Sequence, residues 1–230
     1  MESGGTAKPN DGAVQMTKTA TASPGAGISE ISPRSDVYAL LSSAYSFPDA
    51  SFYIDATDGR LTEQVTSALS QLPYHLRTSD LSWKLPGTYD EMQSEYIRLF
   101  QIGGRRGPPC PLHAGHYTRD RSRALQNLIR FYNYFGFRVM ECVMPDQLAV
   151  QLEFMSELAA GGVTDKASSQ RAQRDFLQNH LGWTETLWGR VAKAGPHPFY
   201  RSLTMLTARL IAADLRFIQT VLGGSNDAAS

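Results

Sequence analysis

One stretch of the sequence, GGRRGPPCPLHAGHYTRDR (103–121), concentrates residue types that can do chemistry. Cys110, His113 and His116 follow one another at intervals of three, and Cys142 could supply a fourth ligand. Thiolate and imidazole groups are what a tetrahedral zinc ion prefers. Against zinc, the stretch lacks the paired C-x-x-C spacing of common zinc modules, and a proline on each side restrains the first cysteine. Zinc therefore stays a less favoured alternative.

Two other chemistries are weaker still. A cysteine near histidines could form a nucleophilic pair of thiolate and imidazole, but no known catalytic signature surrounds Cys110. This residue can equally be a small buried apolar side chain. The GGRRG segment offers glycines and arginines to a phosphate, yet the G-x-x-x-x-G-K-[ST] pattern is missing. The stretch can also be a rigid crossing between helices with Arg105 and Arg106 solvated. We therefore predict no catalytic residue and no metal ligand.

Composition narrows the class of protein. The 230 residues include 22 Lys and Arg against 22 Asp and Glu, so no basic excess indicates nucleic acid or an anionic membrane surface. No apolar run reaches the roughly 18 residues of a membrane span, and the N-terminus lacks the basic and apolar blocks of a secretory signal. We expect a soluble, cytoplasmic protein whose two cysteines are free thiols.

The elements around this stretch have helical periodicity, and no segment shows convincing strand alternation. Apolar residues recur at helical spacing in seven segments, which predicts an all-α fold: 32–48, 61–73, 88–100, 120–137, 144–162, 169–194 and 199–222. Breaks near 103–119 and 161–169 predict a helical bundle of two sub-parts joined by a proline-rich loop and a hinge.

The chain ends and helix starts complete this prediction. Residues 1–33 are poor in apolar positions, which predicts a disordered tail, followed by one helical domain over 34–222 and a flexible tail over 223–230. Asp120 occupies a position that favours a carboxylate at a helix N-terminus. Pro145 is expected to open another helix, with Asp146 in its first turn.

Five segments in this order carry a resemblance to a known family: SEYIRLF, GPPCPLHAGHYTRDR, FYNYFGF, PDQLAVQLEFM and HPFYRSLTMLTARLIAADL. The series resembles the TorD/DmsD/NarJ family of redox-enzyme maturation chaperones, and it covers about residues 34–222. Within the family, PPCPL with YTRDR looks most similar to chaperones of the dimethyl sulfide and ethylbenzene dehydrogenase and the selenate and chlorate reductase type.

The resemblance implies a TorD-like, all-helical fold and a non-catalytic role. Such a chaperone binds the cofactor-free catalytic subunit of a molybdenum enzyme of the dimethyl sulfoxide reductase family in the cytoplasm. It grips the twin-arginine leader or an N-terminal segment, assists insertion of the molybdopterin cofactor and holds back export. The chaperone itself needs no cofactor, because the client carries it.

The family's linker motif, P-D-H followed by an L-E-F-M-like end, also carries over to this sequence. It maps onto Pro145, Asp146, Gln147, Leu148, Glu153, Phe154 and Met155. Gln147 stands where histidine is common in the family, which removes a titrating imidazole but keeps a hydrogen-bonding side chain.

Physical reasoning supports a binding role for these residues. Asp146 and Glu153 lie seven residues, or two helical turns, apart, so both can project from one face with Glu157 one turn further. This acidic stripe would complement a basic leader. An apolar groove for the rest of the leader can be lined by four aromatic residues: Tyr96, Tyr117, Tyr132 and Phe154.

A bracing role for the same charges stays open. Glu153 can instead pair with Arg98 or Arg121 and hold the loop against the helix, because arginine–carboxylate pairs serve both purposes. Tyr117, Asp120 and Arg121 are then expected to anchor the helix that follows the loop. A helical adaptor that reads a different peptide is the other alternative, since a fold does not fix a function.

Overall fold

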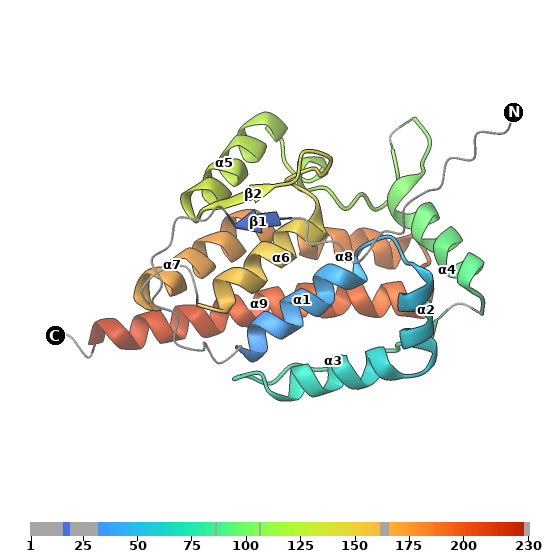
Figure 1. The fold of residues 1–230 in the computed structure, drawn as a ribbon, viewed down its shortest axis with the longest axis horizontal. Helices are drawn as coiled ribbons and strands as arrows, with labels where there is room; N and C mark the ends of the chain where they lie inside the picture. The colour runs from blue at the N-terminus through green and yellow to red at the C-terminus, as the bar shows by residue number, and fades with distance from the viewer. Residues whose placement is uncertain (1–15, 19–31, 86, 106, 162–165, 228–230) are drawn as a thin grey trace, which may run out of the picture.

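The computed structural model describes residues 16–18, 32–85, 87–105, 107–161 and 166–227 (Figure 1). Its α-helices and β-strands follow in this order: β1 (Met16–Lys18), α1 (Pro33–Ala44), α2 (Ala50–Thr57), α3 (Arg60–Ser70), α4 (Tyr89–Tyr96), α5 (Arg121–Tyr134), β2 (Phe137–Val139), α6 (Leu148–Ala159), α7 (Lys166–Phe176), α8 (Thr184–Lys193) and α9 (Pro198–Asp227). The predicted all-α fold class is confirmed, with a small two-stranded sheet as its exception.

Three helices form the centre of the bundle. α1 packs along α6, and α9 passes beside α1, α7 and α8. α5 and the sheet lie on one side of this centre and α3 lies on the other (Figure 1). The core contains large side chains from four helices, among them Tyr38, Phe154, Phe176 and Tyr200. Because the buried residues form one continuous cluster, the two predicted sub-parts share a single core.

Local signals explain where several helices begin. The side chain of Thr88 accepts a hydrogen bond from the backbone N–H of Glu91, whose carboxylate accepts one from the N–H of Thr88 in return. The carboxylate of Asp49 caps α2, and the carboxylate of Asp120 caps α5 as its position predicts. Each cap satisfies a backbone N–H that the first helical turn leaves unpaired.

The sheet departs from the prediction. Met16, Thr17 and Lys18 pair antiparallel with residues 137–139, and the Met16 side chain is buried in the core. Three residues are too few for a visible alternation of apolar and polar positions, so neither strand could be predicted. Of the rest of the predicted N-terminal tail, 1–15 and 19–31 lie outside the described residues, whereas Pro33 already belongs to α1.

Other boundaries differ in detail. α9 continues to Asp227, so the predicted flexible tail is helical over 223–227, and 228–230 lie outside the described residues. Of the predicted linker 161–169, residues from Lys166 onward belong to α7, and 162–165 are not described. The single helix predicted over 169–194 is divided by a π-helical segment (Leu177–Leu181) and a turn at Gly182.

Candidate functional site

The start of α6 holds the proline-rich loop by backbone pairing. Pro145 does not open the helix as predicted, because residues 145–147 form a turn and α6 begins only at Leu148. Leu148 N–H donates to the Leu112 carbonyl at 2.8 Å, and Ala114 N–H donates to the Asp146 carbonyl at 2.9 Å. These bonds place the loop beside the helix start like two short antiparallel strands.

The Asp146 carboxylate is the buried centre of this junction. Its side chain is almost fully buried, with Oδ1 3.2 Å from Nδ1 of His113 and Oδ2 accepting from Gly115 N–H at 3.0 Å. Burial opposes ionisation, but the hydrogen bonds with His113 and Gly115, together with the charge of Arg121, hold the pKa of Asp146 below its ordinary value. Asp146 is therefore an anion that fixes the loop.

A chain of polar and aromatic contacts leads from the backbone carbonyl of Asp146 to α8. The amide of Gln151, fully buried on α6, donates to the Asp146 carbonyl at 3.1 Å. The side-chain oxygen of Gln151 accepts a hydrogen bond from the indole N–H of Trp183 at 3.2 Å. The Trp183 ring stacks on Tyr117 with centroids 4.7 Å apart, and the Arg190 guanidinium lies 4.4 Å from the centre of the Tyr117 ring. Three segments distant in sequence, namely the loop, the start of α6 and the start of α8, are thereby held in one arrangement.

These groups surround a pocket of about 320 Å³ between the loop, α5 and the segment that leads into α8. Arg121 lies along the loop at this pocket, and a Cβ at position 115 would come within 2.8 Å of the Arg121 side chain. Gly115 is thus the residue that lets this side chain lie close. Further lining comes from amide side chains and apolar residues of α5: Gln178, Asn179, Ala124, Leu125 and Leu128.

His180 forms one wall of the pocket. Its ring packs against Phe131 and Phe176, with centroids 5.6 and 5.2 Å away. Burial lowers the pKa of His180 to about 4, so the imidazole is neutral near pH 7. The pocket therefore carries two charges in its lining, the buried carboxylate of Asp146 and the exposed guanidinium of Arg121.

The structure brings some of the predicted site residues together. Tyr117, Arg121 and Asp146 all line the pocket, and Gln147 lies opposite His113 in the loop pairing. Pro145 is adjacent, where its carbonyl accepts the Tyr132 hydroxyl at 3.1 Å. Tyr132 and Phe154 pack on each other in the core beneath, with ring centroids 4.7 Å apart.

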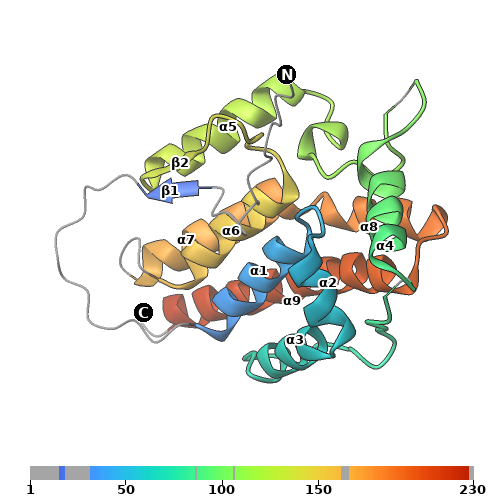
Figure 2. The ribbon, with the colours of Figure 1, turned by 45° about the vertical axis from the view of Figure 1, so that its right-hand side comes forward.

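Other predicted residues lie elsewhere. Tyr96 is buried and donates to the Tyr45 carbonyl at 2.8 Å. Arg98 pairs with Glu95 at 2.7 Å and donates to carbonyls at 194 and 195, next to α8. Figure 2 shows α4 at the end of the molecule away from α7. Neither residue can line a groove with Asp146.

The predicted acidic stripe does not form. Asp146 precedes the helix and is almost fully buried, whereas Glu153 is half-buried on α6 and Glu157 is exposed. The prediction was wrong because it took Pro145 as the first helical residue. Sequence reasoning also missed Gln151, Trp183 and His180, which complete the pocket.

The zinc alternative has no support in the geometry. Cys110 is fully buried, Cys142 is exposed, and the residues that the structure describes contain no group of three His, Cys, Asp or Glu side chains placed to hold a metal ion. Burial raises the pKa of Cys110 to about 11, against the charges of Arg190 and Arg98, so this thiol stays protonated near pH 7. In the described part of the chain, no helix has both the length and the apolar character needed to span a membrane.

Comparison with known proteins gives a consistent result. The model of the nitrate reductase delta subunit family matches residues 58–187, which include the whole pocket. The perchlorate reductase assembly chaperone protein of Dechloromonas aromatica is 28% identical over 198 residues, covering 79% of this chain and 88% of its own length. The selenate reductase assembly chaperone protein of Thauera selenatis is 30% identical over 156 residues, covering 63% of this chain and 68% of its own length.

The chlorate reductase assembly chaperone protein of Ideonella dechloratans is 29% identical over 154 residues, again covering 63% of this chain and 68% of the relative. The family match spans more than half of the chain, and these relatives are chaperones rather than catalysts. The chain therefore belongs to the nitrate reductase delta subunit family, the TorD/NarJ group that its motifs resemble.

Proposed function

We infer that this protein is an assembly chaperone for the catalytic subunit of a molybdenum oxidoreductase of the dimethyl sulfoxide reductase family. It binds the apo-subunit in the cytoplasm, keeps it competent for insertion of the molybdopterin cofactor and delays its export. The names of its relatives, which are assembly chaperones of perchlorate, selenate and chlorate reductases, support this role. The client carries the cofactor, and the chaperone contributes binding without catalysis.

The observation that carries the proposal is the pocket fixed by Asp146. The buried carboxylate, the backbone pairing and the Gln151–Trp183 hydrogen bond hold the pocket in one shape before any partner arrives. A preformed site loses less conformational entropy on binding than a flexible one. Its aromatic, amide and apolar lining suits a short polypeptide segment.

The charges of the pocket indicate which part of the client enters it. Arg121 is exposed, whereas the compensating carboxylate of Asp146 is buried and already hydrogen-bonded. An arginine of the leader would meet a like charge first, at an unfavourable Coulomb energy. We therefore assign the pocket to the N-terminal segment beside the twin-arginine pair rather than to the arginines themselves.

The test is co-expression of the tagged chaperone with the molybdenum-enzyme subunits of its host, followed by affinity capture and mass spectrometry. We expect one catalytic subunit to be retained without cofactor and with its N-terminal segment intact. Arg121→Glu is expected to lower the amount retained, whereas Gln219→Ala, on an exposed position of α9, serves as the matched control.

Two results would contradict this proposal. The wild-type protein could retain no molybdenum-enzyme subunit, which would favour the helical adaptor. Alternatively, a synthetic leader containing the twin arginines could release the bound subunit while the adjoining N-terminal segment does not, which would place the arginines in the site.

A further inference from the structure

A second groove lies between α5 and α7, outside the pocket described above. Its volume is about 530 Å³. The side of α5 contributes residues at helical spacing, namely Asn127, Arg130, Phe131, Tyr134 and Phe135. The side of α7 does the same with Ser168, Arg171, Ala172 and Asp175. Residues at the same helical spacing on α5 and α7 thus line one depression, and His180 lines both this groove and the first pocket.

The floor and one wall of the groove are apolar. Phe135 and Ala172 are buried, and Phe131 packs on Phe135 with ring centroids 5.3 Å apart. Tyr134 stands beside them with 81% of its surface exposed, the largest exposed fraction among the large hydrophobic residues of the described chain. An aromatic ring left in water beside an apolar floor is typical of a surface that binds a partner.

The rim of the groove is basic. Arg130 and Arg171 are exposed, and neither forms a hydrogen bond or ion pair with another residue that the structure describes. Asp175, which also lines the groove, is paired with Arg174 at 2.7 Å. His180 is neutral near pH 7, because burial lowers its pKa to about 4. Two uncompensated guanidinium groups therefore set the charge of this groove.

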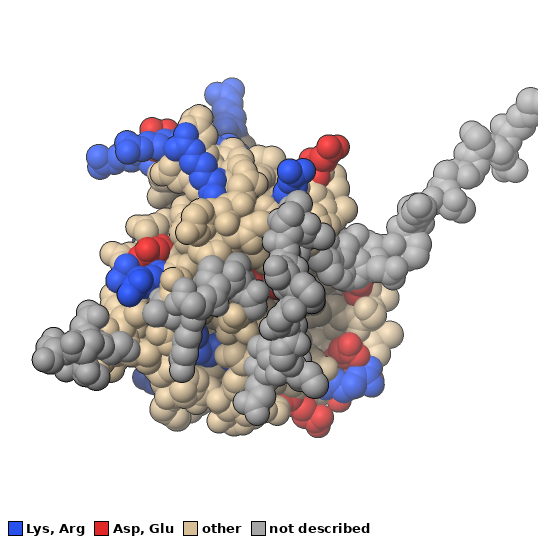
Figure 3. Space-filling model, turned by 60° about the vertical axis from the view of Figure 1, so that its left-hand side comes forward, with Lys and Arg blue, Asp and Glu red and all other residues tan. Residues whose placement is uncertain are grey.

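The surrounding surface has the same sign. Residues 119–138 contain five exposed arginines and one acidic residue, Asp120, whose carboxylate caps α5. Figure 3 views the side of the molecule where α5 lies, and Lys and Arg side chains predominate over Asp and Glu on its upper part. In a chain with a formal charge of zero, this local excess gives the surface a positive potential.

We propose that the α5–α7 groove binds an acidic amphipathic segment of a partner polypeptide. The apolar side chains of that segment occupy the floor between Phe131, Phe135 and Ala172, and its carboxylates pair with Arg130 and Arg171. Charge complementarity selects such a segment over the basic leader, and the apolar floor selects it over a purely anionic ligand. This function goes beyond the proposed binding of the client's N-terminal segment and does not depend on it.

The experiment measures binding of the full chain to a fluorescent peptide of about 16 residues. Its leucines lie on one face of a helix and its glutamates on the other. We expect saturable binding to the wild type. Arg130→Glu and Arg171→Glu should each weaken binding about tenfold, because each variant loses one charge-assisted pair with a glutamate of the peptide. Tyr134→Ala should also weaken it. Arg123→Glu is the matched control, because it removes an exposed arginine of α5 that does not line the groove.

Three outcomes would overturn the proposal. The first is no binding of the acidic peptide by the wild-type protein. The second is equal binding of the same peptide with serine in place of leucine, because a polyanion surface would then explain the result. The third is equal weakening by Arg123→Glu and Arg130→Glu. All variants change exposed side chains, so circular dichroism should show unchanged folding.

Discussion

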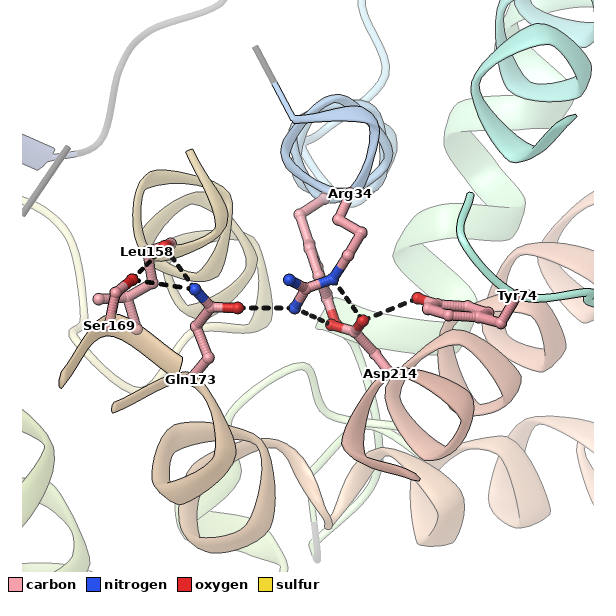
Figure 4. A network of polar contacts seen from close by, with 7 residues as sticks. Arg34, Tyr74, Leu158, Ser169, Gln173 and Asp214 are labelled. Atoms are coloured by element: carbon pink, nitrogen blue, oxygen red, sulfur yellow. Dashed lines mark hydrogen bonds and ion pairs between the residues drawn. The ribbon is translucent and has the colours of Figure 1, made fainter. Parts of the chain in front are cut away.

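Arg34 and Asp214 form an ion pair inside the protein, although 180 residues separate them in the sequence. Nη2 of Arg34 lies 2.7 Å from Oδ2 of Asp214, and the hydroxyls of Tyr38 and Tyr74 donate to the same carboxylate. Arg34 also donates to Gln173 on α7 at 2.7 Å. Figure 4 shows this network joining the first turn of α1 to α7 and to the middle of α9.

Removing the carboxylate should destabilise the fold strongly. Asp214→Leu leaves the Arg34 guanidinium buried without its partner, so we expect the free energy of unfolding to fall by about 3–5 kcal/mol. The double variant Arg34→Met/Asp214→Leu should recover most of this loss, because no charge then stays buried. Urea unfolding monitored by tryptophan fluorescence measures the free energy of unfolding of the wild type, the single variant and the double variant.

The exposed pair Arg60–Asp55, with both side chains about half exposed, is the matched control. Asp55→Leu should change the free energy of unfolding far less than Asp214→Leu does, because water screens an exposed ion pair. If Asp214→Leu costs no more than this control, the interior pair does not stabilise the bundle.

Asp146 predicts a specific dependence of stability on pH. Its pKa is lower in the folded protein than in the unfolded chain, so its ionisation contributes stability above the unfolded value, near 3.9, and this contribution is lost as the pH falls through the folded value. Asp146→Asn should cost about 1–3 kcal/mol at pH 7. The difference from the wild type should stay constant down to about pH 5 and shrink below about pH 4.

Urea midpoints between pH 7 and pH 3 measure this difference. Asp120→Asn is a suitable comparison, because asparagine also caps helices and the side chain is exposed. A loss of stability at Asp146 that is independent of pH would show that the ionised form has no special role in holding the loop.

The loop before Cys110 offers a test of backbone geometry. A Cβ at Gly103 would overlap the carbonyl oxygen of Gly107 and lie 2.6 Å from Cα of Pro108, whereas a Cβ at Gly104 would meet nothing within 4 Å. We expect Gly103→Ala to lower the melting temperature and to reduce the free energy of unfolding by about 1–3 kcal/mol, because the backbone at 103 and at 107–108 must move apart. Equal melting temperatures for Gly103→Ala and Gly104→Ala would contradict this geometry.

Periodicity predicted most of the helices but not their joints. α1, α3, α4, α5 and α9 are predictable because each buries an apolar stripe at helical spacing. α6 was predicted in the same way, although ten of its twelve residues are buried. α2 has a single buried residue, Ala56, so it has no stripe to detect. The start of α6 was misplaced because Pro145 satisfies a rule for a first helical residue, whereas pairing with the loop delays the first helical residue to Leu148.

The site was only partly predictable for a different reason. Asp146 and Tyr117 lie in recognisable motifs, but Trp183 reaches the pocket from the N-cap position of α8 and His180 from the π-helical segment before it. No local pattern links residues so far apart. Arg34 shows the same limit, because arginine is normally expected in solvent and only its partners on α9 and α7 explain its burial.

The two thiols should differ sharply in reactivity. Cys142 is exposed on the turn after β2, whereas Cys110 is fully buried and burial raises its pKa to about 11. The thiolate is the reactive form, so the buried cysteine reacts only when the fold opens. We expect a disulfide reagent such as Ellman's to modify one thiol per chain in buffer and two in urea. Cys142→Ser should abolish the reaction in buffer.

Fast modification of both thiols in buffer would mean that the loop leaves the core readily, and the pocket beside it would then not be preformed.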